Sequence, residues 1–183
     1  MSLFVVVSVL LAYLSRESLR HVRAHGFYRF LAWECILGLL LLDFVSFRRW
    51  FADPTSPRQI VSWLFLCGSI VPVVWGTLLL RAKGGLDARR SDDPALIAFE
   101  RTSRLVTTGV YAYIRHPMYA SLLYLAWGVF FKRPFWISGV LVLAATAFLV
   151  LTARVEEVED VRYFGDDYGS YMRRTKMFVP FVF

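Results

Sequence analysis

The run IVSWLFLCGSIVPVVWGTLLL, residues 60–80, decides the class of fold, because it is long, apolar and free of charged side chains. About 20 predominantly apolar residues in a helix cross the hydrocarbon core of a bilayer. The composition agrees: hydrophobic residues make up 57% of the chain and charged residues 19%, against roughly a quarter charged in soluble domains. The sequence therefore predicts an all-α integral membrane protein, and 183 residues are expected to form a single domain.

Four further apolar runs suggest that the chain crosses the membrane several times. They cover residues 2–14, 27–47, 117–131 and 134–153. The first and third of these are short, so each needs helical extension into its polar flanks or shielding by other helices. We therefore expect a polytopic bundle of about five transmembrane helices. Its parts are three N-terminal helices (1–80), a cytoplasmic loop (81–116), a helical hairpin (117–153) and a cytoplasmic tail (154–183).

The basic residues are distributed unevenly between the two sides of this predicted bundle. With five spans, 16 of the 21 Lys and Arg residues fall on the side that holds the 15–26 loop, the 81–116 loop and the tail. The positive-inside rule then predicts a cytoplasmic C-terminus and an N-terminus on the outside. Because topology explains the net charge of +7, the sequence gives no reason to expect a nucleic-acid partner.

Local signals predict where several helices begin and end. Pro117 suits the first turn of a helix, where its missing N–H leaves no hydrogen bond unmade. Asp93-Pro94 favours a short interfacial helix at about 94–101. Gly165 is expected to stop the helix that continues from the last span, and Asp166 or Asp167 is expected to cap a second short helix.

Polar residues on the predicted cytoplasmic face are the first candidates for chemistry. Arg115, His116 and Tyr119 stand where a helix enters the membrane, and either interfacial anchoring or a binding site explains them. Glu156 and Glu157 follow the last span, where the helix dipole disfavours negative charge. They are either a solvated acidic face or carboxylates that bind a cation.

Other possible sites are weaker. Glu34 lies inside the second span, where an ionisable group usually faces a cavity or a partner, and it could line a pocket. His21 and His25 have the i, i+4 spacing of helical metal ligands, but no third ligand is visible, so no metal site is expected. Cys35 and Cys67 lie in apolar runs and imply no disulfide.

Two segments together resemble a known family. LVTTGVYAYIRHPMYAS (105–121), a helical hairpin, and EEVEDVRYFGDDYGSYMRRTKMFVP (156–180) resemble the isoprenylcysteine carboxyl methyltransferases and the related membrane phospholipid methyltransferases. The residues that carry the resemblance are Gly109, Tyr111, Arg115, His116, Pro117, Tyr119, Glu156, Glu157, Phe164, Gly165, Tyr168, Tyr171 and Pro180. The resemblance covers residues 103–181; residues 1–80 match only as apolar helices.

The resemblance implies a binding site for S-adenosyl-L-methionine, with S-adenosyl-L-homocysteine as product, on the cytoplasmic side. The cofactor contacts that it implies are Ser103, Arg104, Leu105, Val106, Tyr111, His116, Pro117, Met118, Tyr119 and Glu156. A carboxylate suits the ammonium and sulfonium groups of such a ligand, and aromatic rings suit its adenine. The free N–H groups at the predicted helix start suit a hydrogen-bond acceptor.

The methyl acceptor is expected to be lipophilic and to arrive from the membrane lipids. The carboxyl methyltransferases place a substrate-binding arginine four residues before the first glutamate, where this chain has Thr152; the nearest arginine is Arg154. A carboxylate acceptor needs a cation such as Arg154 or Arg115. An amine acceptor needs a base, for which Glu157, Glu34 and His116 are candidates.

Three alternatives stay open beside an isoprenylcysteine carboxyl methyltransferase-like enzyme. In that enzyme Glu157 and Arg115 are the catalytic candidates, and Arg154 and Glu34 the substrate-binding candidates. The alternatives are a phospholipid N-methyltransferase of the phosphatidylethanolamine type, an NADPH-dependent sterol reductase-like enzyme, and a non-catalytic bundle. The glutamate pair favours a methyltransferase over a reductase. The sequence predicts no oligomeric state.

Overall fold

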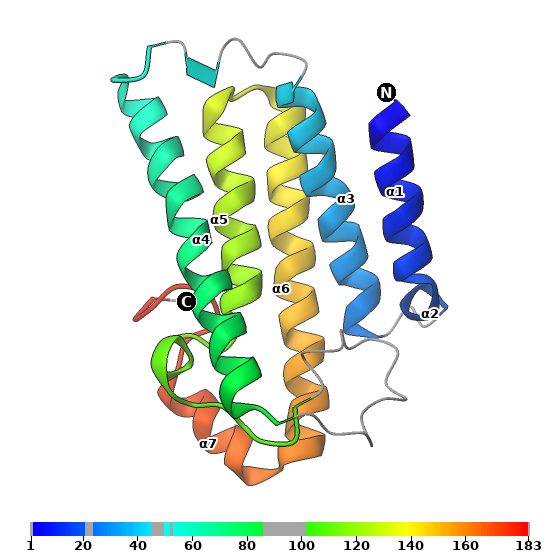
Figure 1. Ribbon diagram of the computed structural model, residues 1–183, viewed down its shortest axis with the longest axis vertical. Coiled ribbons are helices and arrows are strands. Elements are labelled where there is room, and N and C mark those ends of the chain that lie inside the picture. The colour runs from blue at the N-terminus through cyan, green and yellow to red at the C-terminus, as the bar shows by residue number, and fades with distance from the viewer. Residues whose placement is uncertain (1, 21–23, 45–49, 52, 86–101, 183) are drawn as a thin grey trace.

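The computed structural model describes residues 2–20, 24–44, 50–51, 53–85 and 102–182. Five long helices run side by side (Figure 1). They are α1 (Ser2–Leu14), α3 (His25–Phe44), α4 (Pro57–Lys83), α5 (Pro117–Lys132) and α6 (Trp136–Phe164). Shorter elements are α2 (Arg16–Leu19), the 3-10 helix η3 (Gly109–Ala112) and α7 (Asp166–Arg174). The predicted all-α class is confirmed for the described residues, and each of the five apolar runs contains a helix.

The helices form a layer in which sequence neighbours are not always spatial neighbours. From one edge of Figure 1 to the other, the order is α4, α5, α6, α3 and α1, with α4 packed against α5 and α3 against α6. The end of α4, the segment before α5, the end of α6 and α7 all lie at the lower end of this view. The N-terminal and C-terminal halves therefore meet along two helix pairs, α4 with α5 and α3 with α6.

Small residues bring α4 and α5 close together at two points. A Cβ on Gly128 would lie 2.8 Å from Leu66 Cγ and 3.0 Å from the Leu66 backbone nitrogen. Beside it, Ser62 Oγ donates a hydrogen bond to the Gly128 carbonyl at 2.7 Å. Nearer the other end, a Cβ on Gly76 would lie 2.9 Å from Pro117 Cγ. These close approaches fix where the start of α5 lies against α4.

The contact between α3 and α6 is a well-buried apolar seam. Its buried side chains are Ala32, Ile36 and Leu39 from α3 and Val142, Ala145, Leu149 and Ala153 from α6, each at most 5% exposed. Alanines on both helices let the backbones approach, so larger neighbours interdigitate at the density of a protein core. This seam sets the position of α6 relative to the first half of the chain.

Two helices, α4 and α6, are long and apolar enough to cross a membrane. Only 17% of the most apolar window of α4 and 33% of that of α6 are buried inside the bundle. Leu64 and Leu78 of α4 are 68% and 61% exposed, and such an extended apolar surface is typical of contact with lipid. The other long helices are shorter or, like α3, carry ionisable residues.

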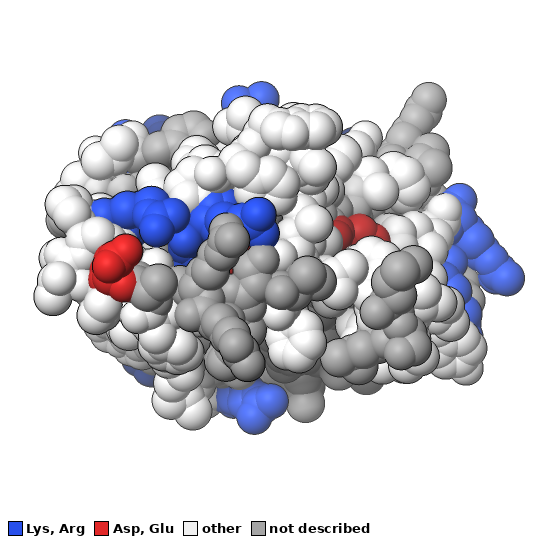
Figure 2. All heavy atoms as spheres, turned by 90° about the horizontal axis from the view of Figure 1, so that it is seen from above, with Lys and Arg blue, Asp and Glu red and all other residues white. Residues whose placement is uncertain are grey.

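The end of the bundle opposite the lower loops carries a band of basic side chains (Figure 2). There Lys132, only 2% exposed, donates to Gln59 Oε1 at 2.9 Å and lies 3.5 Å from the centre of the Trp63 ring. Arg58 Nη1 donates to the Lys132 carbonyl at 3.0 Å. These contacts tie the α5–α6 turn to the start of α4.

Several predicted helix ends match the structure. Pro117 begins α5, and Gly165, at φ 63°, follows the last residue of α6. The next helix, α7, begins at Asp166, but its N-cap is Gly165 and no side chain caps it, so the predicted capping by Asp166 or Asp167 is wrong. The predicted interfacial helix at 94–101 lies outside the described residues, as do residues 45–47 of the predicted second span.

Candidate active site

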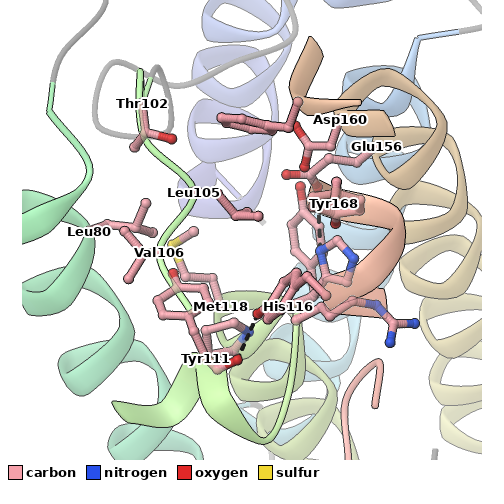
Figure 3. Close-up of a pocket in the computed structure, with 15 residues that line it drawn as sticks. Leu80, Thr102, Leu105, Val106, Tyr111, His116, Met118, Glu156, Asp160 and Tyr168 are labelled. Carbon is pink, nitrogen blue, oxygen red and sulfur yellow. Dashed lines mark hydrogen bonds and ion pairs between the residues drawn. The ribbon is translucent and has the colours of Figure 1, made fainter. Parts of the chain in front are cut away.

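A pocket with about 650 Å³ of empty space opens at the lower end of the bundle. Figure 3 shows it between the end of α4, the segment that leads into α5, and the end of α6 with α7. This volume includes space that is open to solvent. Its walls combine aromatic and aliphatic side chains with two carboxylates, Glu156 and Asp160.

Most of the predicted cofactor contacts line this pocket. Leu105, Val106 and Tyr111 come from the segment before α5, residues 116–119 from the start of α5, and Glu156 from α6. Ser103 and Arg104 are exposed and are not part of the wall. Their backbone N–H groups instead donate to the Gly85 and Gly84 carbonyls at 3.0 and 2.9 Å, which fastens the segment to the end of α4.

The segment before α5 follows a turn that only glycine fits well. Gly109 has φ 64°, and a Cβ there would lie 2.5 Å from Leu79 Cδ1. Tyr171 Oη donates to the Tyr111 carbonyl at 2.8 Å, so α7 supports this segment from the other side. The tail adds a short ladder in which Arg115 N–H donates to the Lys176 carbonyl at 2.8 Å.

His116, the residue before α5, lies between the two glutamates. Its Nδ1 is 3.7 Å from Glu156 Oε2, and its Nε2 is 3.3 Å from Glu157 Oε1. The ring is nearly parallel to that of Tyr119, with centroids 5.6 Å apart, and meets Phe178 edge-on at 6.2 Å. This packing holds the imidazole in one plane between the carboxylates.

Arg115 and Glu157 form a buried ion pair beside the pocket. Arg115 Nε donates to Glu157 Oε1 at 2.6 Å, and the two side chains are 10% and 9% exposed. Arg115 Nη1 also donates to the carbonyls of Met172 and Thr175, at 3.2 and 2.5 Å. The guanidinium therefore joins α5, α6 and the tail, and a buried charge with these partners is well satisfied.

Glu156 is the carboxylate that faces the pocket. Its side chain is 15% exposed, and Oε2 is buried with no hydrogen-bond partner among the described residues. Asp160 follows four residues later, on the same side of α6, and lines the same pocket. His116 Nδ1, at 3.7 Å from Oε2, is too far for a hydrogen bond. Since a buried carboxylate oxygen that accepts no hydrogen bond is costly, this wall suits a ligand that carries a cation or a hydrogen-bond donor.

Aromatic side chains from the end of α6 and from α7 form another part of the wall. Phe164 and Tyr168 stack nearly parallel, with centroids 6.4 Å apart. Burial raises the pKa of both Tyr168 and Tyr171, and the nearby carboxylate of Asp160 raises it further. Both phenols therefore stay neutral at physiological pH, so they serve as ring surfaces and as O–H donors rather than as bases.

The residues predicted to bind the acceptor do not line this pocket. Glu34 accepts a hydrogen bond from Ser8 Oγ at 2.7 Å, which links α3 to α1. Arg154 is exposed on α6. Thr152, at the position where the family has an arginine, is fully buried and donates to the Phe148 carbonyl at 2.7 Å.

Sequence reasoning missed several pocket residues. They are Leu80, Thr102, Asp160, Phe164, Tyr168 and Tyr171. The spacing of Asp160 from Glu156 is a signal that could have found it, because residues four apart share a helix face. Phe164, Tyr168 and Tyr171 belong to the motif that carries the resemblance, yet no role was assigned to them.

No group of three or more metal-ligating side chains occurs in the part of the chain that the structure describes. His25 instead pairs with Glu159 of α6. The other histidine of the predicted i, i+4 pair, His21, lies outside the described residues.

Most of the pocket wall comes from the part of the chain that matches a known family; Leu80, Tyr168 and Tyr171 lie outside the matched range. Residues 94–167 match the family described as phospholipid methyltransferase. This match includes the Arg-His-Pro turn and both glutamates. The predicted resemblance to isoprenylcysteine carboxyl methyltransferase-like proteins is confirmed by relatives that carry this name.

Two of these relatives are protein-S-isoprenylcysteine O-methyltransferases. The Mus musculus protein is 34% identical over 128 residues, and the Homo sapiens protein 32% over 127. Each alignment covers 67% of this chain and 43% of the relative. A methanethiol S-methyltransferase of Pseudomonas deceptionensis is 26% identical over 149 residues, which cover 74% of this chain and 51% of that protein. The chain thus spans about half the length of these curated relatives. No solved structure matches it.

Proposed function

We propose that this chain is a membrane-embedded, S-adenosylmethionine-dependent methyltransferase that acts on a lipophilic acceptor, in the manner of an isoprenylcysteine carboxyl methyltransferase. The observation that carries this proposal is Glu156 Oε2, a buried carboxylate oxygen that accepts no hydrogen bond among the described residues, lies 3.7 Å from His116 Nδ1 and belongs to the wall of the pocket. The surrounding segments are those that match the phospholipid methyltransferase family. The names of the relatives support methyl transfer as the reaction.

The residues present fit the chemistry of this cofactor. Glu156 and Asp160 would hold its ammonium and sulfonium groups, and Phe164 and Tyr168 would face its adenine. The first turn of α5, which begins at Pro117, lines the pocket, and backbone N–H groups at such a helix start would suit an acceptor atom. When bound, S-adenosylmethionine supplies an electrophilic methyl group to the nucleophile of the acceptor.

The chain itself contributes mainly position and the exclusion of water. The Arg115–Glu157 pair holds the start of α5 against α6, so that His116 and Glu156 keep a fixed separation. Holding reacting groups in a near-attack arrangement lowers the entropic part of the barrier. Met118 and Val106 close part of the wall with apolar surface, which keeps water from competing with the acceptor.

The chemical class of the acceptor determines whether a base is needed. A carboxylate, as in the main proposal, is already ionised and needs only a nearby cation. An amine, as in the alternative phospholipid N-methyltransferase, and a thiol must lose a proton first, and His116 and Glu157 are the candidate bases within the site. Arg154 and Glu34 stay candidates for acceptor binding outside the pocket wall.

We also propose that all five long helices cross the bilayer, with the pocket and the C-terminus in the cytoplasm and the N-terminus outside. The short α1 and α5 would be completed by their polar flanks or by neighbouring helices. The excess of basic residues at the pocket end supports this orientation. A cysteine-labelling experiment with a membrane-impermeant reagent on intact cells tests it, since a cysteine placed at exposed Lys176 should stay unlabelled.

A methyl-transfer assay tests the activity directly. The full chain in lipid nanodiscs would be supplied with radiolabelled S-adenosylmethionine and, separately, an N-acetyl-S-prenylcysteine, phosphatidylethanolamine and methanethiol. Label in the prenylcysteine that is released as methanol by mild base identifies a methyl ester, whereas N-methyl and S-methyl products survive base. Transfer to phosphatidylethanolamine alone would favour the alternative. Absence of transfer to every acceptor, together with no binding of S-adenosylhomocysteine, would contradict the proposal.

A further inference from the structure

The last three turns of α6 carry four carboxylates that point in three directions: Glu156, Glu157, Glu159 and Asp160. Each residue of an α-helix turns about 100° from the one before. Glu156 and Asp160 therefore share the pocket side, as Figure 3 shows, whereas Glu157 turns towards Arg115 and Glu159 turns the opposite way, towards α3. The direction in which Glu156 points depends on the rotation of α6, and contacts on both sides of Glu156 fix that rotation: Glu157 with Arg115, and Glu159 with α3.

On the α3 flank, Glu159 is held by His25, the first residue of α3. His25 Nδ1 lies 2.5 Å from Glu159 Oε2 and joins residues 134 positions apart in the chain. The His25 side chain is fully buried, whereas Glu159 is 29% exposed. The contact lies next to the α3–α6 seam, so it locks the rotation of α6 where the seam ends.

Charge strengthens this contact. Burial lowers the pKa of His25, but the hydrogen bond that His25 donates to Glu159 and the charges of Glu156 and Glu159 outweigh it, and the net pKa is raised above its ordinary value of 6.5. Arg29, one turn further along α3, opposes the rise. These are the charged groups that face His25 from α3 and α6. A cation here also offsets the repulsion between the carboxylates and the C-terminal end of the α6 dipole.

We propose that His25 is a positioning residue for the pocket. By pairing with Glu159 it fixes the end of α6 so that Glu156 and Asp160 point at the ligand. In this way the N-terminal half of the chain, which contributes few residues to the pocket wall, determines the affinity of a site that belongs to the C-terminal half. This inference rests on the proposed function, because it assumes that the pocket binds the cofactor.

Variants of both partners test the proposal by titration with S-adenosylhomocysteine. His25→Leu removes the pairing atom, and Glu159→Gln removes the charge from the partner, which is partly exposed and tolerant of change. His25→Asn keeps an N–H donor near the place of Nδ1. Arg162→Gln removes an exposed charge from the same end of α6 and is the matched control. Each full-length variant would be studied in nanodiscs at several values between pH 6 and pH 8.5, with its melting temperature measured in parallel.

We expect His25→Leu and Glu159→Gln to weaken binding at least fivefold, with no additive loss in the double variant, and His25→Asn to recover part of it. In the wild type, affinity should fall as the pH rises through the raised pKa of His25. This part of the pH dependence should vanish in His25→Asn. If His25 only stabilised the fold, the pH dependence of ligand affinity would be the same in the wild type and in this variant. Wild-type affinity in folded His25→Leu and in Glu159→Gln across this pH range would overturn the role of His25 alone. No binding by the wild type would overturn the proposed function as well.

Discussion

Arg115 donates from Nε to Glu157 Oε1 at 2.6 Å, and this one contact fastens the residue before His116 to the residue after Glu156. His116 and Glu156, which line the pocket, are therefore each adjacent in sequence to one member of this buried ion pair. Arg115 also reaches the carbonyls of Met172 and Thr175, so the same side chain brings the tail to the site. The ion pair therefore holds the segment before α5, the end of α6 and the tail in fixed positions around the pocket.

Replacing Arg115 by alanine should therefore destabilise the protein strongly. The change leaves the Glu157 carboxylate buried without its main cation and removes two bonds to the tail, and breaking a buried pair in this way costs about 3–5 kcal/mol. Thermal unfolding in detergent, followed by tryptophan fluorescence, measures the loss. The double variant Arg115→Met, Glu157→Leu should recover much of the stability, because it leaves no uncompensated charge. A double variant as unstable as Arg115→Ala would argue against charge burial as the cause.

Glu156→Gln should leave the fold intact and weaken the binding of S-adenosylhomocysteine at least tenfold. Glutamine keeps the shape of the side chain but loses the charge that faces the ammonium group, and a tenfold loss corresponds to about 1.4 kcal/mol. The melting temperature checks the fold, and Arg162→Gln is again the control. Unchanged affinity in Glu156→Gln would mean that the ligand lies elsewhere.

Gly109 and Gly165 have nearly the same φ but different surroundings, so alanine substitutions at the two positions distinguish backbone strain from steric overlap. Gly109 and Gly165 have φ 64° and 63°, but a Cβ on Gly109 would lie 2.5 Å from Leu79 Cδ1, whereas one on Gly165 meets nothing within 4 Å. Gly165→Ala should cost about 1–3 kcal/mol from backbone strain alone, because φ 63° with ψ −139° is a conformation that side chains other than glycine rarely adopt. Gly109→Ala should cost clearly more and should also weaken ligand binding, because it displaces the segment that carries Tyr111. Equal melting temperatures for the two variants would contradict this account.

A second pair of glycines tests the packing of α4 against α5. Gly128→Ala would place a Cβ 3.0 Å from the Leu66 backbone nitrogen, so the helices must separate, at a cost of about 1–3 kcal/mol. Gly68→Ala meets nothing within 4 Å and should stabilise α4 by up to about 1 kcal/mol through helix propensity. Unfolding curves of the two variants in the same detergent should shift in opposite directions. A shift in the same direction would show that this close approach does not govern stability.

Much of the fold could be predicted because its signals are local. Pro117 marks the start of α5, Gly165 the end of α6, and the apolar runs give the long helices. The rotation of each helix could not be predicted, because a run that is apolar on all sides does not show which face is buried. For this reason Glu34 was expected near the acceptor path, although it bonds to Ser8 of α1.

The part of the candidate site that could be predicted consists of the motif residues that carry the family resemblance. His116, Tyr119 and Glu156 line the pocket as the motif implied. The continuing helix was predicted, and Asp160 was missed because the sequence does not show which face of that helix lines a pocket; His25 was missed because its partner is 134 residues away. Contacts of such long range depend on tertiary packing, which no local pattern records.

The most direct test of the account is calorimetric titration of the full chain in nanodiscs with S-adenosylhomocysteine, with NADPH as the comparison ligand. The account predicts saturable binding of S-adenosylhomocysteine that is lost or at least tenfold weaker in Glu156→Gln, and no binding of NADPH. No binding of S-adenosylhomocysteine by the folded wild type, or binding of NADPH that Glu156→Gln abolishes, would contradict it.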